Sequence, residues 1–123
     1  MSCLFQSLGY FVRVHPDILR RQICEFLATD PVIIQPDFKV SVAIKFQPDI
    51  PSTSLAQYVQ MMSLQHTNGG AIEIRAFCLL YNKNVKVELC GQHVSQKPIE
   101  FAYNPHFDWV KISWNGGHYE PVN

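Results

Sequence analysis

The sequence predicts an α+β fold, with helices first along the chain and a small, mostly antiparallel sheet last. Before residue 82, apolar residues recur every three or four positions in several segments, which is the spacing of helices buried on one face. After residue 84, apolar and polar residues alternate, as they do in half-buried strands. The chain has 123 residues, of which 47% are hydrophobic, so we expect a single domain, residues 1–123, with its own core.

The first two helices are predicted over residues 3–12 and 16–28, because the apolar residues of each segment fall on one helical face. Pro16 suits the first position of a helix, where the missing N–H costs nothing. Asp17 suits the first turn, where the helix dipole favours a negative charge. Arg20 falls on the polar side of the second helix and is expected to face solvent.

The middle of the chain is predicted to hold an irregular segment followed by two helices. Residues 31–54 contain four prolines and show no sustained period, so we expect irregular structure there. Ser54 suits the N-cap of a helix over residues 55–65. The run Thr-Asn-Gly-Gly at residues 67–70 ends that segment, and the last helix is predicted over residues 71–81.

Four short segments near the C-terminus are predicted as strands. Residues 85–89, 99–103 and 109–114 alternate apolar with polar side chains. Residues 115–117, Asn-Gly-Gly, have the composition of a hairpin turn, and a last strand begins with His118.

The composition excludes several classes of function. Ten basic and ten acidic residues give no net charge, which argues against a nucleic-acid footprint. No apolar run reaches the roughly 18 residues of a transmembrane helix, and the N-terminus lacks the basic residues of a signal peptide. The four cysteines are far apart, which indicates thiols in a reducing, cytoplasmic setting and no zinc site. We expect a monomer that uses no metal or other cofactor.

Cys3 and His118 are the candidates for chemistry. Cys3 begins a predicted helix, where unpaired N–H groups and the helix dipole favour a thiolate. A histidine that is distant in sequence but adjacent in the fold can take up the thiol proton. Four cysteines and five histidines allow many such pairs, so spacing alone leaves structural roles open.

The order of several short motifs resembles the ovarian tumour (OTU) family of cysteine deubiquitinases, from Cys3 to Val122. The motifs are Cys-Leu-Phe at 3–5, Gly-Gly-x-x-Glu at 69–73 and His-Tyr at 118–119. The resemblance implies an OTU-like fold of the papain-like superfamily and a thiol-dependent isopeptidase. Its partner would be ubiquitin or a ubiquitin-like protein.

The resemblance also implies roles for individual residues. Cys3 would be the nucleophile and His118 the general base and acid. Glu120, two positions after the histidine on the same strand, would orient the imidazole. The alternative for Glu120 is an exposed strand carboxylate with no catalytic role.

For the residues at the two glycine pairs, both a structural role and a substrate-binding role are open. By the resemblance, Asn68, Gly69 and Gly70 would line the channel that receives the C-terminal tail of ubiquitin, and Gly117 would clear space beside the histidine. Alternatively, Asn68 caps a helix and the later glycines form a turn that needs positive φ.

One feature departs from the family pattern. OTU enzymes usually carry an Asp-Gly block just before the cysteine, where this sequence has only Met1 and Ser2. We therefore expect the loop before the cysteine to be absent or truncated. The alternative function is a catalytically impaired OTU-like domain that binds ubiquitin or another protein.

Overall fold

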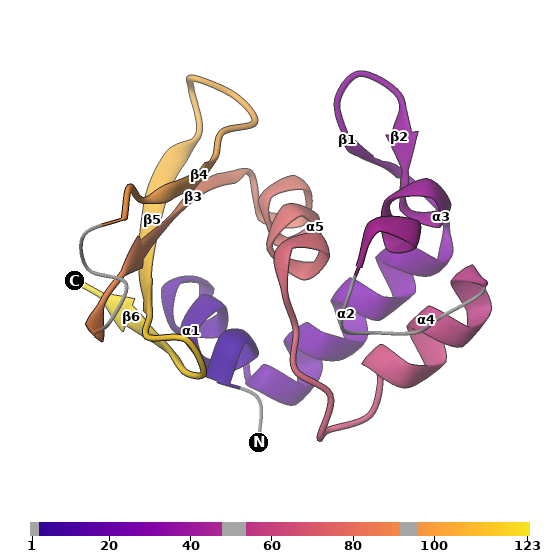
Figure 1. Ribbon diagram of the computed structural model, residues 1–123, viewed down its shortest axis with the longest axis horizontal. Coiled ribbons are helices and arrows are strands. Elements are labelled where there is room, and N and C mark those ends of the chain that lie inside the picture. Colours follow the sequence, from indigo (N-terminus) through magenta and orange to yellow (C-terminus); the bar gives the residue numbers. More distant parts are fainter. Residues whose placement is uncertain (1–2, 48–53, 92–95) are drawn as a thin grey trace.

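A computed structural model describes residues 3–47, 54–91 and 96–123, and the side chain of Cys3 lies outside the described part. Figure 1 shows helices on one side of the molecule and the main sheet on the other. The predicted α+β fold, with helices first and a mostly antiparallel sheet last, is confirmed.

The two N-terminal helices have the predicted bounds, α1 at Cys3–Val12 and α2 at Pro16–Ala28. The His15 side chain caps α2 by accepting a hydrogen bond from the backbone N–H of Asp17, at 3.1 Å. On α1, the residues Leu4, Phe5 and Leu8 are at most 1% exposed, so this helix contributes a full apolar face to the core.

The prediction of irregular structure over residues 31–54 is wrong for the part that the structure describes. The ordered elements there are β1 (Val32–Ile34), β2 (Phe38–Lys39), α3 (Val40–Ala43) and the 3-10 helix η1 (Ile44–Phe46). The Asp30 carboxylate accepts bonds from the backbone N–H and the hydroxyl of Ser41, both at 2.8 Å. These two hydrogen bonds hold the first turn of α3. The order of this segment therefore comes from a side-chain acceptor and is not visible as a periodic pattern in the sequence.

The next two helices are α4 (Leu55–Met62) and α5 (Ala71–Tyr81). Ser54 caps α4 as predicted, accepting from the backbone N–H of Gln57 at 3.2 Å. The helix ends three residues before the predicted residue 65. The N-cap of α5 is Gly70, so the expectation that Asn68 caps this helix is wrong.

In the described residues, the main sheet has the strand order β4-β3-β5-β6. The outer pairs, β3–β4 and β5–β6, are antiparallel, whereas the central pair β3–β5 is parallel. The buried apolar residues of β3 and β5 face the helices, and ion pairs such as Lys111–Glu88 at 3.1 Å lie on the other face. The strands are β3 (Lys83–Leu89), β4 (Ile99–Phe101), β5 (Asp108–Trp114) and β6 (Tyr119–Val122).

The core lies between the main sheet and the helices. In Figure 1, α1 and α5 cover one face of the sheet, and α2 and α4 pack behind them. The largest buried side chains come from all of these layers and include Phe5, Tyr58, Phe77 and Ile112. Among the described helices, none has both the length and the apolar character needed to cross a membrane.

Candidate active site

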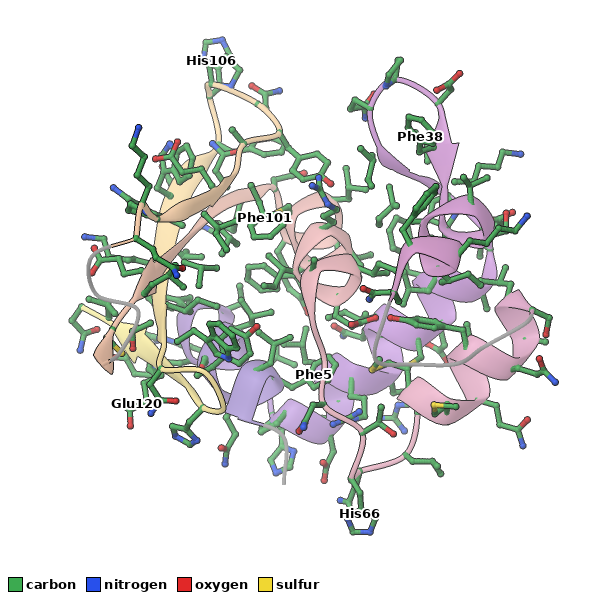
Figure 2. All side chains as sticks on the ribbon, viewed as in Figure 1. Phe5, Phe38, His66, Phe101, His106 and Glu120 are labelled. Atoms are coloured by element: carbon green, nitrogen blue, oxygen red, sulfur yellow. The ribbon has the colours of Figure 1, made fainter. Side chains whose placement is uncertain are left out.

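Cys3 is the first residue of α1. At this position the backbone N–H groups of the first turn have no partner within the helix, and the dipole favours a thiolate. The next two residues, Leu4 and Phe5, are buried, and Figure 2 shows Phe5 in the interior of the molecule. The core therefore fixes the start of the helix that carries the candidate nucleophile.

His118 is held by a tight turn directly before β6. The Asn115 side-chain oxygen accepts hydrogen bonds from the backbone N–H groups of Gly117, at 3.1 Å, and His118, at 2.9 Å. Gly116 has a φ of 103°, a backbone conformation that residues with a side chain rarely adopt. The positive φ predicted for this turn thus occurs at Gly116, whereas a Cβ at Gly117 would have no neighbour within 4 Å.

His118 and Glu120 lie side by side. The imidazole Nε2 is 3.6 Å from Oε1 of Glu120, which is an ion-pair distance and longer than a hydrogen bond. The side chains are 54% and 69% exposed, so solvent screens this contact. With Nε2 facing the carboxylate, Nδ1 is the ring nitrogen left to exchange a proton with a thiol.

The strand that follows His118 packs against the helix that begins with Cys3. In Figure 1, α1 and β6 run in the same general direction, and the turn before β6 lies beside the start of α1. Their far ends are joined by a hydrogen bond from the Tyr10 hydroxyl to the Asn123 side-chain oxygen, at 2.9 Å. The start of α1 and the start of β6 are therefore at the same end of the fold.

The structure separates the roles of the glycine pair before α5. Gly69 is buried, and a Cβ built on it would lie 2.7 Å from Cδ2 of Leu4 and 3.1 Å from Cε2 of Phe5. A Cβ built on Gly70 would have no neighbouring atom within 4 Å, and Asn68 is exposed. Gly69 is thus needed for a close approach to the first turn of α1, whereas Gly70 and Asn68 are free of that constraint.

Glu73 is a buried residue of this region to which the sequence analysis gave no role. Its Oε1 accepts a 2.7 Å hydrogen bond from the backbone N–H of Gly70, and its Oε2 accepts a 2.6 Å bond from the Tyr58 hydroxyl. Burial raises the Glu73 pKa to about 7, against the opposing effect of both hydrogen bonds. A glutamate at the third position of a predicted helix is the available sequence signal, since such residues bond back to the N-cap.

Arg20 is 4% exposed, so the prediction that it faces solvent is wrong. Its guanidinium donates to the backbone carbonyls of Met62 at 2.6 Å and Thr67 at 2.9 Å, and lies 4.3 Å from the centre of the Phe5 ring. Five donors allow arginine to satisfy several carbonyls of one loop, which compensates its burial. Arg20 thereby ties the segment after α4 to the first turn of α1.

A cleft of about 350 Å³ opens beside the first turn of α1. Its lining residues are Phe5, Gln6, His15, Pro16, Asp17, Arg20 and Gln65. In the described residues, no three histidine, cysteine, aspartate or glutamate side chains gather as a metal site would require.

The other described cysteines differ from one in an activated position. Cys24 and Cys78 are buried, and burial raises the pKa of their thiols to about 11 and about 12. Cys90 is half-buried. At neutral pH little of Cys24 or Cys78 is therefore in the thiolate form, so both should react slowly with a thiol-selective reagent.

Comparison with known proteins identifies the fold. No protein-family model and no curated protein matches the sequence. Among solved structures, an OTU domain in complex with ubiquitin matches with a TM-score of 0.71 and 22% identity over 97% of this chain. The OTU domain of OTUD1 matches with a TM-score of 0.69 and 18% identity over 98%. This chain spans 62% of the first of these chains and 78% of the second, and it has the fold of the ovarian tumour domains.

Proposed function

We propose that this chain is a cysteine isopeptidase that removes ubiquitin or a ubiquitin-like protein from its conjugates. The observation that supports it most directly is the His118–Glu120 pair at the start of β6, the strand that packs on the helix beginning with Cys3. A histidine within hydrogen-bond reach of a helix-terminal cysteine can activate its thiol, and the packing of β6 on α1 brings the segments that carry both residues to the same end of the fold.

In the proposed reaction, His118 takes the Cys3 proton at Nδ1, and the thiolate attacks the carbonyl carbon of the isopeptide bond. The N–H groups of the first turn of α1, which have no acceptor within the helix itself, favour the negative charge that develops on the carbonyl oxygen. The imidazolium then protonates the departing lysine amine, leaving a thioester on Cys3. Water activated by the neutral imidazole hydrolyses the thioester, which releases the ubiquitin carboxylate and restores the thiol.

The substrate class is supported by the structural comparison. One of the matching OTU domains was solved in complex with ubiquitin. Glu120 supports the chemistry because its carboxylate lies beside Nε2 of His118, where it is placed to orient the imidazole.

One observation favours a second candidate, a ubiquitin-binding OTU-like domain with little or no activity. The His118–Glu120 contact is 3.6 Å long and exposed, so Glu120 orients the imidazole weakly in this structure. A domain of this kind would bind ubiquitin without forming a covalent adduct.

The deciding experiment is mass spectrometry after incubation with ubiquitin that carries a thiol-reactive group at its C-terminus. We expect one ubiquitin adduct on the wild type and none on Cys3→Ala or His118→Ala. His106→Ala is the matched control, because His106 is also exposed and its backbone N–H also bonds an asparagine side chain at 2.9 Å. Figure 2 shows His106 at the opposite end of the molecule from Glu120. Absence of an adduct on a folded wild type that still binds ubiquitin would refute the isopeptidase and support the binding domain.

A further inference from the structure

The segment that joins α4 to α5 is held by two buried charged side chains. Arg20 of α2 donates to the backbone carbonyls of Met62, the last residue of α4, and of Thr67 within the segment. Glu73 of α5 accepts from the backbone N–H of Gly70 at its end. The end of this segment is therefore fixed by a carboxylate that is 0% exposed and that the proposed reaction does not use.

The same segment contacts the start of α1. Gly69 approaches Leu4 and Phe5 so closely that an added methyl group would lie 2.7 Å from Leu4 Cδ2. Both residues follow Cys3 directly and are buried. Hence Glu73, Gly70, Gly69 and the first turn of α1 form a continuous chain of contacts that leads to the helix residue Cys3.

Several groups surround the Glu73 carboxylate. Tyr58 of α4 donates its hydroxyl to Oε2, and the hydroxyl pKa is raised by burial and by Glu73. From α2, the positive charge of Arg20 favours the carboxylate, and the thiol of Cys24 is also within electrostatic range. The two carboxylate oxygens thus serve different partners: Oε1 holds the segment backbone and Oε2 holds α4.

We propose that Glu73 is a positioning residue for Cys3, an inference that rests on the proposed function. By accepting the hydrogen bond of Gly70, it fixes Gly69 against Leu4 and Phe5 and so fixes the start of the helix that carries the nucleophile. The Tyr58 hydroxyl bonds the other oxygen, Oε2, and so anchors the carboxylate to α4.

Three variants test the proposal. Glu73→Met keeps a similar volume but leaves Gly70 without its acceptor. Glu73→Gln retains an acceptor for Gly70, and its amide can donate to the Tyr58 oxygen. Tyr58→Phe is the matched control because it removes the hydrogen bond to Oε2 of Glu73 and leaves the bond between Gly70 and Oε1 in place. The rate of adduct formation with the ubiquitin electrophile is measured at a temperature at which circular dichroism shows each variant folded.

We expect Glu73→Met to react at least about tenfold more slowly than the wild type, because small displacements of a nucleophile cost large factors in rate. Glu73→Gln restores the rate, and Tyr58→Phe retains it to within about threefold, since both keep the bond to Gly70. Equal losses in Glu73→Met and Tyr58→Phe, or no loss in Glu73→Met, would overturn the proposal.

A second readout does not need activity. In amide NMR spectra, Glu73→Met should shift the Leu4 and Phe5 resonances more than Tyr58→Phe does. If the wild type forms no adduct, the proposed function fails, and these resonances alone decide whether Glu73 positions the start of α1. Unchanged Leu4 and Phe5 resonances in Glu73→Met would refute the positioning role whatever the activity.

Discussion

Replacing Gly69 by alanine should destabilise the protein, whereas the same change at Gly70 should have a much smaller effect. The Gly69 Cβ would lie 2.7 Å from Leu4 Cδ2, 3.1 Å from Phe5 Cε2 and 3.3 Å from Phe5 Cζ. Leu4 and Phe5 are 1% and 0% exposed, so neither side chain can move aside into solvent. The overlap must be relieved by shifting the first turn of α1 or the backbone before α5.

The magnitude follows from the cost of overpacking a buried site. Adding a methyl group to a filled core typically costs about 1–3 kcal/mol, and the closest contact at Gly69 places this site toward the upper end. At Gly70 an added Cβ meets nothing within 4 Å, and φ is −146°, outside the left-handed region. Gly70→Ala should therefore change stability by less than about 1 kcal/mol, because the gain from restricting the unfolded chain is opposed by the preference of the N-cap of α5 for glycine over alanine.

Urea unfolding followed by circular dichroism measures both effects. We expect the urea midpoint of Gly69→Ala to fall well below that of Gly70→Ala, with equal slopes. A Gly69→Ala variant as stable as Gly70→Ala would refute the close approach of this segment to α1. It would also remove the contact through which Glu73 is proposed to act.

Two further predictions concern buried polar groups. Asn84 is 1% exposed and bonds backbone groups of Tyr103, Asn104 and Phe107, so Asn84→Ala should cost about 3 kcal/mol in urea unfolding; a loss below about 1 kcal/mol would contradict this. Burial raises the Glu73 pKa from 4.5 to about 7, so the folded state holds this proton more tightly than the unfolded chain. As the pH rises from 4.5 to about 7, the wild type should therefore lose stability relative to Glu73→Gln. At pH 8 this loss should be at most about 3 kcal/mol. Unfolding free energies measured from pH 4 to pH 8 check the sign, and a relative gain by the wild type would contradict it.

The elements that sequence patterns predict well are those whose caps and apolar faces lie within the same segment. The bounds of α1, α2 and α5 agree with the predictions because helical spacing and local break residues determine them. The short elements between residues 32 and 46 were missed because they depend on tertiary contacts. Ile33 and Val40 are buried under other elements, and Asp30 reaches eleven residues forward to Ser41.

The parallel pairing of β3 with β5 is a second feature that local pattern does not encode. An alternating strand pairs equally well in either direction, and the direction here depends on how the chain returns through β4 to the other edge of β3. Arg20 illustrates the same limit for a side chain. The helical spacing of α2 places Arg20 on the polar side of the helix. Its burial depends on the carbonyls of Met62 and Thr67, which lie more than 40 positions away in the sequence.

The candidate site combines residues of two kinds, and the difference decides which variants are informative. Gly69 and Glu73 serve the fold, because they are buried and contact the first turn of α1 or hold the segment that does. Their presence is therefore explained with or without catalysis. The His118 and Glu120 side chains are 54% and 69% exposed, and surface changes of this kind usually alter stability by less than about 0.5 kcal/mol. A loss of adduct in His118→Ala consequently reports chemistry, whereas a loss in Gly69→Ala must first be corrected for stability.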